Sequence, residues 1–373
     1  MELVELDSVC EIIAGQSPPS SSYNQDKVGV PFFQGKADFG RINPTVRYWC
    51  TEPKKMSVIN DILFSVRAPV GSTNVNNIEA SIGRGLAAIR CNKEIDLQFL
   101  LHYLRANEER IANMGTGSTF KAITIKTLKS IKIPLPPLPT QKRIASILDE
   151  ADTLRQLNKQ LITKYDALTQ SLFLEMFVKE KKFEQVELIE LVNKITDGTH
   201  HTPTYTDSGI PFLRVTDITK SNDSKKFISK EEHEVLIKRC NPEKEDILYT
   251  KNGTIGVAKI VDWDYEFSVF VSLCLIKPKH EKINNKFLET FLNTPYALNQ
   301  AKKHSKTGTI TNLHLIEIKK MKIPLPPITL QNQFAERVAL IEQQKAQAQQ
   351  SLQKSEDLFN SLLQKAFKGE LVK

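Results

Sequence analysis

The sequence predicts an α+β protein of two similar globular portions, each followed by one long helix, so that the whole chain is a pseudo-two-fold internal repeat. The stretch IPLPPLPTQ at 133–141 recurs as IPLPPITLQ at 323–331. Each copy leads into a run of about 40 polar-rich residues without Gly or Pro. Segments ahead of the two copies also match one another in the same order, which indicates that the fold is used twice.

The matching segments describe each globular portion from its start to its end. VELDSVCEIIAGQSPPSSSY at 4–23 matches VELIELVNKITDGTHHTPTY at 186–205, and DILFSVRAPVG at 61–71 matches DILYTKNGTIG at 246–256. TGSTFKAITIKTLKSIKIPLPP at 116–137 likewise matches TGTITNLHLIEIKKMKIPLPP at 307–327. The repeat places the first globular portion at 1–138 and the second at 183–328.

Strands and short helices follow from residue type within each portion. The β-branched and aromatic runs FFQG, DILFSV and AAIRC predict strands, as do their counterparts PFLRV, DILYTK and FVSLCLIK. Helices are expected at about 97–114 and 285–304. Each portion should therefore hold a mixed or antiparallel sheet.

The two long runs predict helices of about 60 Å at 139–182 and 329–373. Thr140 is the expected N-cap of the first, after a proline run that cannot be helical. Asn158, Lys345 and Ser355 fall on the apolar seams, where polar residues fix register. A narrow seam needs a partner helix, and the other copy supplies it in an antiparallel, intramolecular coiled coil. The predicted seams are Ile147, Ala151, Leu154, Leu161, Tyr165, Leu168 and Leu172 on the first helix, and Phe334, Val338, Ile341, Ala348, Leu352, Phe359 and Leu362 on the second.

Composition narrows the class of protein. The 373 residues exceed one typical core, and the net charge of +8 with a pI near 9.0 favours a polyanionic partner such as nucleic acid. No stretch of 18 apolar residues or basic leader is present, so we expect no membrane span. The five cysteines are scattered and odd in number, which indicates a reducing cytoplasm.

Motifs for catalysis are missing from the sequence. It contains no G-x-x-x-x-G-K-[ST] phosphate loop, no G-x-G-x-x-G turn and no N/D-P-P-[FYW] tetrapeptide of the kind used in base methylation. Glu243, Glu245, Asp246 and Lys251 could be arranged as a metal-nuclease pattern, against the alternative of a solvated loop. His200 and His201 are adjacent and lack partners at zinc spacing, which favours a surface loop.

This arrangement resembles the specificity subunit of a type I restriction-modification system over the whole chain. The matching features are the paired globular portions, the KIPLPP boundaries at 132–137 and 322–327, Gln141 and Gln331 after them, and LLQKAFKGEL at 362–371. Thr140 and Leu330 stand where the family usually carries Glu before that Gln, which leaves the capping of both helices open.

The resemblance implies a non-catalytic subunit that binds double-stranded DNA. Each globular portion would be a target-recognition domain for one half of a bipartite asymmetric site, with the helices as spacers that dock two methyltransferase subunits. No cofactor is expected on this chain. S-adenosylmethionine, ATP and Mg²⁺ would belong to those methyltransferase subunits and to restriction subunits.

Loops that match between the halves carry the cationic and hydrogen-bonding side chains that DNA recognition needs. Arg67 and Arg214 are candidates for guanine, and Gln34 and Asn252 for adenine; for each, a surface salt bridge or turn hydrogen bond is the alternative. The candidate DNA-binding residues of the first portion are Gln16, Ser17, Ser20, Ser21, Gln34, Lys36, Arg67, Arg84, Ser118, Thr119 and Lys121. Those of the second are Thr196, Asp197, Thr199, His200, His201, Thr202, Arg214, Thr216, Asp217, Lys251, Asn252, Lys306, Thr307, Thr309 and Thr311.

Three other functions remain open at this point. A self-sufficient methyltransferase-nuclease would bind its own cofactor, and a tethering protein built on the helices would show no sequence-dependent DNA affinity. The chain could also be the specificity subunit of another bifunctional, type IIB-like restriction enzyme, with the same DNA-recognition function in a different kind of enzyme.

Overall fold

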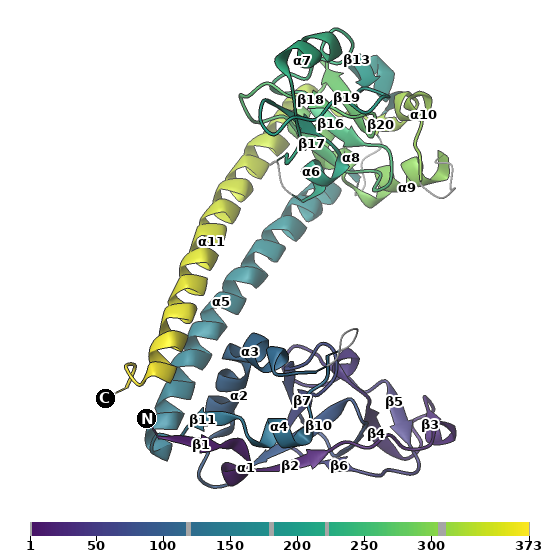
Figure 1. The fold of residues 1–373 in the computed structure, drawn as a ribbon. Helices are drawn as coiled ribbons and strands as arrows, with labels where there is room; N and C mark the ends of the chain where they lie inside the picture. Colours follow the sequence, from purple (N-terminus) through teal and green to yellow (C-terminus); the bar gives the residue numbers. More distant parts are fainter. Residues whose placement is uncertain (1, 117–120, 179–182, 221–223, 305–310, 373) are drawn as a thin grey trace. The chain divides into compact units, whose positions relative to one another are not determined.

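The computed structural model describes residues 2–116, 121–178, 183–220, 224–304 and 311–372 (Figure 1). The chain divides into two compact units: unit 1 comprises Met1–Lys159 with Gln350–Lys373, and unit 2 comprises Gln160–Gln349. Each unit holds one globular portion and part of each long helix. Within the described ranges, no helix has both the length and the apolar character needed to cross a membrane.

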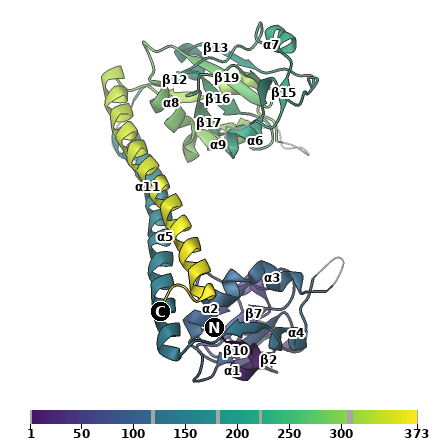
Figure 2. The same cartoon turned by 60° about the vertical axis from the view of Figure 1, so that its left-hand side comes forward.

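The globular portion of unit 1 has three layers. An antiparallel sheet of order β2-β10-β7-β8 lies in the middle, and α2 covers one of its faces (Figures 1 and 2). Phe64 packs toward α2, whereas Leu63 points to the other face and packs with Phe33 and Ile82 of the second sheet, because successive strand residues alternate. That second sheet has the order β3-β5-β4-β9-β6, with β4 and β9 parallel. The elements are β1 (Leu3–Glu5), α1 (Leu6–Val9), β2 (Cys10–Ala14), η1 (Ser20–Ser22), β3 (Tyr23–Asn24), β4 (Val30–Phe33), η2 (Lys36–Asp38), β5 (Tyr48–Cys50), β6 (Met56–Ser57), β7 (Ile62–Ser65), β8 (Thr73–Val75), β9 (Ala80–Ile82), β10 (Leu86–Cys91), α2 (Leu97–Ala106), α3 (Glu108–Asn113), α4 (Ile125–Lys129) and β11 (Lys132–Pro134).

The globular portion of unit 2 repeats these layers. Its central antiparallel sheet has the order β13-β19-β16-β17, and its second sheet has the order β15-β14-β18 with β14 and β18 parallel. Tyr249 packs toward α8, and Leu248 packs toward the second sheet with Leu213. The elements are β12 (Gln185–Glu187), η4 (Leu188–Leu191), β13 (Val192–Asp197), β14 (Ile210–Leu213), α6 (Val215–Thr219), β15 (Phe227–Ile228), α7 (Lys230–Leu236), β16 (Ile247–Thr250), β17 (Ala258–Ile260), β18 (Ser268–Val269), β19 (Leu273–Pro278), α8 (Asn285–Leu292), α9 (Pro295–His304), α10 (Leu315–Lys319) and β20 (Lys322–Pro324).

Strand registers relate the two units residue by residue. The central strands β10 and β19 pair with their neighbours in corresponding registers on both sides, and the parallel pairs β4–β9 and β14–β18 also correspond. The positions that follow these strands can therefore be equated. The equivalent pairs are Ala14 with Asp197, Gln34 with Arg214, Val66 with Lys251, Arg67 with Asn252, and Arg84 with Val271.

The six predicted strands are confirmed as β4, β7, β10, β14, β16 and β19. Each predicted short helix is broken in two, which the sequence analysis did not anticipate. The break in unit 1 falls at Asn107, whose side-chain amide donates to the carbonyl of Tyr103. In unit 2 the break precedes Pro295, because proline lacks the backbone donor and restricts the residue before it.

The long helices are α5 (Leu138–Phe173) and α11 (Ile328–Lys368). Thr140 is not the N-cap of α5: the backbone N–H groups of Thr140 and Gln141 both donate to the carbonyl of Pro137, so the helix starts earlier. Proline fits the first turn of a helix, where its missing N–H has no intrahelical partner anyway. At its other end α5 passes into a π-helical turn at Leu174–Val178.

Gln141 and Gln331 attach the start of each long helix to its globular portion. Both side chains are fully buried. Oε1 of Gln141 accepts from the backbone N–H of Asp96 at 2.7 Å, and its Nε2 donates to two backbone carbonyls. Gln331 repeats the arrangement, with Oε1 accepting from the N–H of Asn284 at 2.9 Å. An amide is needed because the site presents both a donor and acceptors.

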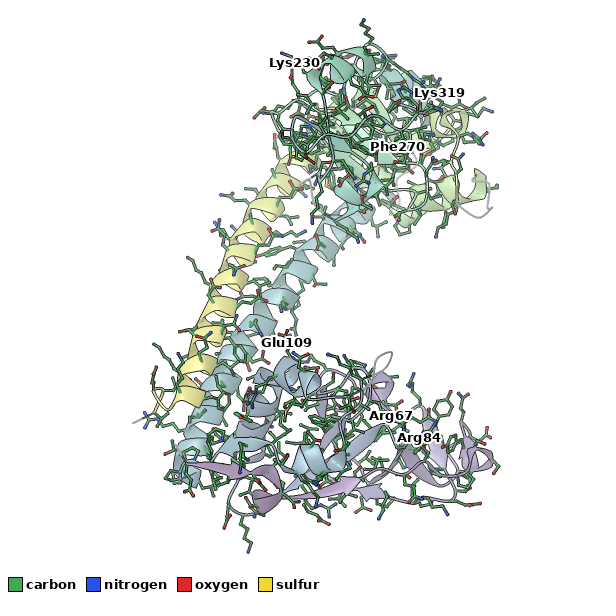
Figure 3. All side chains as sticks on the ribbon, viewed as in Figure 1. Arg67, Arg84, Glu109, Lys230, Phe270 and Lys319 are labelled. Atoms are coloured by element: carbon green, nitrogen blue, oxygen red, sulfur yellow. The ribbon has the colours of Figure 1, made fainter. Side chains whose placement is uncertain are left out.

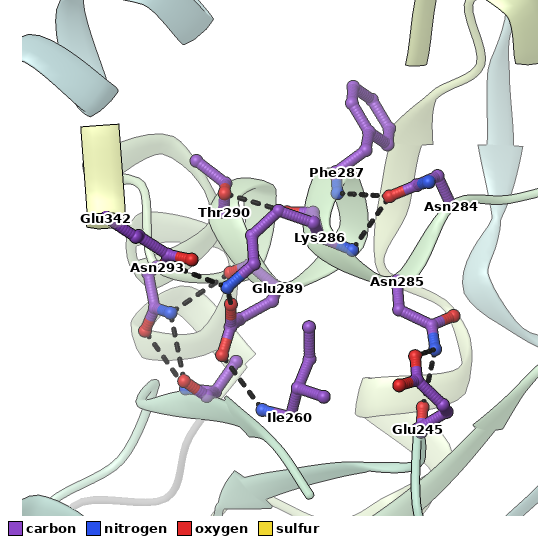
Figure 4. Close-up of polar contacts among 11 residues, drawn as sticks. Glu245, Ile260, Asn284, Asn285, Lys286, Phe287, Glu289, Thr290, Asn293 and Glu342 are labelled. Carbon is purple, nitrogen blue, oxygen red and sulfur yellow. Dashed lines mark hydrogen bonds and ion pairs between the residues drawn. The ribbon is translucent and has the colours of Figure 1, made fainter. Parts of the chain in front are cut away.

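In unit 2 an ion pair reinforces this attachment. Figure 4 shows Lys286 on α8 between Glu289, at 2.6 Å, and Glu342 on α11, at 3.0 Å. Burial lowers the pKa of Lys286, but the two carboxylates outweigh it and raise the pKa overall. Asn284 caps the same helix by accepting from the backbone N–H groups of Lys286 and Phe287.

The seam predicted for α11 is buried or half-buried at every position, whereas the seam predicted for α5 is wrong in part. Leu154, Leu161 and Leu168 are exposed. In unit 1 the inward positions are instead held by Arg155, whose guanidinium lies 4.3 Å from the ring centre of Phe359, and by neighbouring polar residues. The apolar pattern of the sequence predicts leucine at these places, but an aromatic ring on the partner helix also accepts a cation.

Two of the predicted polar register contacts are present, each within its own unit. In unit 1 Asn158 donates through Nδ2 to Oγ of Ser355 at 3.3 Å. In unit 2 Lys345 pairs with Asp166. Rising residue numbers on α5 meet falling numbers on α11 in both units, so the local pairing is antiparallel.

Candidate nucleic-acid interface

Five of the predicted residues of unit 1 converge on one cleft of about 400 Å³. Ser17, Gln34, Lys36, Arg67 and Arg84 line it, from four loops that are far apart in sequence. Figure 3 shows Arg67 and Arg84 on adjacent loops. All five side chains are exposed, and the cleft contains three cations without a lining carboxylate. A cleft of this composition suits an anionic, hydrogen-bonding ligand.

The loops of this cleft are held by short polar contacts. The backbone N–H of Gln34 donates to Asp38 Oδ2 at 2.7 Å, and buried Asp38 is paired with Arg47. The backbone N–H of Arg84 donates to Oγ of Ser17 at 3.2 Å. Gly85 allows the close approach of these loops, because a Cβ there would lie 2.5 Å from the carbonyl oxygen of Gln34. The backbone of Gln34 and of Arg84 is thus fixed by these contacts, and the side chains of both residues are exposed.

The other predicted residues of unit 1 do not line this cleft. Gln16, Ser20 and Ser21 are exposed on the neighbouring loop. Lys121 is exposed and donates to Oδ1 of Asn113 at 3.1 Å. Ser118 and Thr119 lie outside the described residues.

In unit 2 a buried aspartate holds the loop after β14 in the same way. Asp217 is buried, and its Oδ2 accepts from the backbone N–H of Arg214 at 2.8 Å, as Asp38 does for Gln34. Arg214 also places Nε 3.5 Å from that carboxylate. Asp217 was predicted to contact DNA; its carboxylate is buried and closes its own turn through Oδ2, which leaves little of it exposed to a ligand. Arg214 is half-buried and Thr216 is exposed beside it.

Asp197, Thr199 and Lys251 were also predicted to contact DNA, and all three are buried. The carboxylate of Asp197 lies 3.3 Å from Nζ of Lys251, which neutralises a cation that would otherwise be buried alone. The hydroxyl of Thr199 accepts from the backbone N–H of His201. Their burial weighs against direct DNA contact and indicates that they hold the loop.

The remaining predicted residues of unit 2 lie around these anchors. His200, His201 and Thr202 are exposed, and Thr196 is half-buried. Asn252 forms an isolated bridge with Asn312. The backbone N–H of Gly253, which follows Asn252, donates to the carbonyl of Thr311. Lys306, Thr307 and Thr309 lie outside the described residues.

One residue of this region was missed. Arg239 follows α7 and contacts Asp197 through Nη2, and its side chain is 54% exposed. Arg239 lies between β14 and β16, in a stretch that has no matching sequence in the first half of the chain. The internal repeat therefore gave no indication of it. A cation next to a buried carboxylate is visible only in the folded structure.

The possible metal-nuclease pattern is not assembled. Asp246 precedes β16 and pairs with Lys277 at 2.7 Å, whereas Lys251 follows β16 and pairs with Asp197. Burial raises the pKa of Asp246, against the effect of Lys277. Over the described part of the chain, no group of three or more His, Cys, Asp or Glu residues is placed to hold a metal ion.

Comparison with known proteins decides the family. The model of the type I restriction modification DNA specificity domain matches residues 1–164 and again 180–354. The chain belongs to this family. The predicted resemblance to a type I specificity subunit is thereby confirmed, and the two matched regions agree with the repeat.

Individual relatives agree with this assignment. The chain is 50% identical over 162 residues to a putative MjaX specificity subunit of Methanocaldococcus jannaschii, a match that covers 43% of this chain and 38% of that protein. It is 26% identical to the EcoBI specificity subunit of Escherichia coli, over 99% of this chain and 85% of that protein. The crystal structure of a type I S subunit from M. genitalium has the same fold, with a TM-score of 0.59 at 19% identity over 98% of this chain and 96% of that one.

Proposed function

We propose that this chain is the DNA-reading, non-catalytic subunit of a type I restriction-modification enzyme. Each globular portion, 1–138 and 183–328, reads one half of a bipartite asymmetric DNA site. The helices at 139–182 and 329–373 form an intramolecular coiled coil that fixes the gap between the half-sites and docks two methyltransferase subunits.

One observation carries this proposal: the two units share a frame but differ in the side chains at equivalent exposed loop positions. Buried Asp38 and Asp217 hold the same turn, and the residue each turn presents is Gln34 in one unit and Arg214 in the other. Two globular portions with the same frame but different loop side chains suit two half-sites of different sequence.

The side chains fit direct reading of bases in a groove. Arg67 and Arg214 can each donate two parallel hydrogen bonds to guanine, and the amide of Gln34 can pair with adenine, whereas Asn252 could do so only if its buried Oδ1 turned outward. Lys36 and Lys121 supply charge for backbone phosphates. The cleft of unit 1 gives Gln34, Lys36, Arg67 and Arg84 one common point of approach.

Catalysis is assigned to partner chains. Methylation with S-adenosylmethionine would belong to the methyltransferase subunits, and ATP- and Mg²⁺-dependent cleavage to restriction subunits. Because the repeat presents two near-equivalent surfaces, one chain should recruit two methyltransferase subunits. Mass measurement of the co-purified complex tests this, and a uniform one-to-one particle would contradict it.

The function is tested by mapping methylated adenines in a host that expresses the chain with its methyltransferase partner. We expect methylation at one bipartite sequence with a constant gap. Arg67→Ala should then alter only one half-site and Arg214→Ala only the other. Methylation without a bipartite consensus, or variants that each alter both halves, would overturn the proposal.

A further inference from the structure

Three basic side chains of unit 2 surround a single buried carboxylate. Asp197 is 3% exposed, and it is contacted by Lys251, Arg239 and His200. Lys251 is buried with it, whereas the side chains of Arg239 and His200 are 54% and 59% exposed. Arg239 and Lys251 alone carry two positive charges against one negative charge. The cluster therefore has an excess of positive charge, and that excess lies on its exposed side.

Unit 1 has nothing comparable at the equivalent positions. Ala14 stands in place of Asp197 and Val66 in place of Lys251. The same frame is thus stable without this ion pair, so the fold does not require it. A buried ion pair is weak evidence for stability, because desolvation of both charges offsets their attraction. The cluster has another role in unit 2.

We propose that Arg239 and His200 bind a phosphodiester group of the DNA backbone, and that Asp197, anchored by Lys251, is the positioning residue for both. This inference rests on the proposed function. It assigns to unit 2 a phosphate contact that unit 1 does not share.

The hydrogen-bonding geometry supports an outward-facing pair of donors. Nε2 of His200 lies 3.2 Å from both carboxylate oxygens of Asp197 and 3.1 Å from Nη2 of Arg239. Nε2 either donates to the carboxylate or accepts from the guanidinium, and both arrangements fix the ring. When Nε2 accepts from the guanidinium, the proton lies on Nδ1, and the ring presents an Nδ1–H donor on the edge away from the carboxylate; in the other neutral tautomer Nδ1 is an acceptor and does not bind a phosphate oxygen. The guanidinium uses Nη2 toward Asp197 and keeps further N–H groups for a phosphate oxygen.

The position of the cluster connects it to the candidate interface. Asp197 ends β13 and leads directly into the loop with His200 and His201, which corresponds to the Ser17 loop of the unit 1 cleft. Lys251 directly precedes Asn252, the equivalent of Arg67. A phosphate held here would place the DNA backbone beside the base-reading positions of unit 2.

The first experiment compares Arg239→Ala with Lys244→Ala in the full chain bound to its methyltransferase subunits. Each variant removes one exposed positive charge, but Lys244 precedes β16, at the opposite end of that strand from Lys251, and pairs with Asp264. Affinity for cognate and scrambled duplexes is measured from 50 to 200 mM salt. Loss of one phosphate contact should reduce the salt slope by about 0.9, so that the advantage of wild type over Arg239→Ala falls about 3.5-fold across this range. The loss should be equal for both duplexes, and Lys244→Ala should keep the wild-type slope.

The second experiment tests the positioning role with the double variant Asp197→Ala/Lys251→Val, which copies the side chains of unit 1. We expect it to fold with near wild-type thermal stability but to show the reduced slope of Arg239→Ala. Adding Arg239→Ala to it should lower the slope no further. A wild-type slope in a folded double variant would show that Asp197 does not orient the contact.

The outcomes separate this inference from the proposed function. If wild type discriminates cognate from scrambled DNA but Arg239→Ala keeps the wild-type slope, the phosphate site is wrong and the function stands. If Arg239→Ala weakens only cognate binding, Arg239 reads a base and the inference is again wrong. If wild type does not discriminate at all, the proposed function fails, and a reduced slope in Arg239→Ala would still identify a phosphate contact.

Discussion

The buried glutamines at the start of the long helices give the sharpest test of how the frame is held together. Gln331→Leu keeps the approximate volume of the side chain but removes three hydrogen bonds: one from the N–H of Asn284 and two to the carbonyls of Pro326 and Lys282. Two of these are 2.9 Å long and the third is 3.3 Å, so we count two full bonds and one weak one. At about 1 kcal/mol per bond, with a further penalty for the buried N–H left without a partner, the free energy of unfolding should fall by about 2 to 4 kcal/mol.

Urea unfolding can assign this loss to unit 2. The chain has two tryptophans, Trp49 in unit 1 and Trp263 in unit 2, so a Trp49→Phe background leaves fluorescence that reports on unit 2 alone. With a denaturant dependence of about 3 kcal/mol per M, the midpoint should fall by about 1 M. Gln333→Leu is the matched control, because Gln333 is exposed two residues further along α11 and its loss should change stability by less than about 0.5 kcal/mol.

The result that would refute this reasoning is a Gln331→Leu midpoint equal to that of Gln333→Leu. The amide would then contribute no net stability, and the attachment of α11 would depend on packing alone. The corresponding change in unit 1, Gln141→Leu in a Trp263→Phe background, should be at least as large, because the shortest contact there is 2.7 Å.

Three further predictions concern the reading positions and the helices. Arg67→Ala should relax one base position in one half-site at a cost of about 1 to 3 kcal/mol in discrimination, measured by competition between cognate and singly substituted duplexes; equal loss for scrambled DNA would contradict base reading. Asp217→Ala should destabilise unit 2 by about 1 kcal/mol in the Trp263 fluorescence assay, because it removes the carboxylate that accepts from the backbone N–H of Arg214 at the start of α6. An unchanged midpoint would show that this hydrogen bond is dispensable. Four residues inserted after Gln160 lengthen α5 by about 6 Å and rotate the residues that follow by only about 40°. Methylation mapping should therefore show a gap longer by one or two base pairs with unchanged half-sites. An unchanged gap in an active variant would mean that the helices do not set the spacing.

The repeat made most of the frame predictable. The three strands predicted in each unit were supported twice, since matching runs occur before each IPLPP stretch, and α5 and α11 followed from long runs without Gly or Pro. The start of α5 lies within two residues of Thr140, as expected, but Thr140 is not its cap, because the carbonyl of Pro137 already accepts the first helical bonds. The seam of α5 was misjudged because Arg155 occupies an inward position next to Phe359 while Leu154 and Leu161 are exposed; Asn158 lies on the seam as predicted.

The candidate site was predictable as a set of loops but not in the role of each side chain. Polar residues on matching loops marked the cleft of unit 1, where five of them meet. The same criterion could not distinguish a reading side chain from an anchor, so Asp217 and Lys251 were included with Arg214 and Asn252. Burial makes that distinction, and burial depends on neighbours distant in sequence, such as Asp197 beside Lys251.

Under the proposed function, the division between anchors and reading positions would let one frame serve two different half-sites. Asp38 and Asp217 hold equivalent turns through backbone N–H groups, so the anchor does not depend on which side chain the turn presents. Gln34 and Arg214 therefore share the backbone contact that holds the turn, although only Arg214 also contacts its anchor through the side chain. The same holds where Arg67 is replaced by Asn252, since the bridges that fix these residues, to Ala122 and Asn312, also use the backbone. Exchange of the side chains at these positions between the units should change which bases are read. Each unit should still fold, because the hydrogen bonds that shape the loops are made by backbone groups, and every residue except proline has both a backbone N–H and a backbone carbonyl.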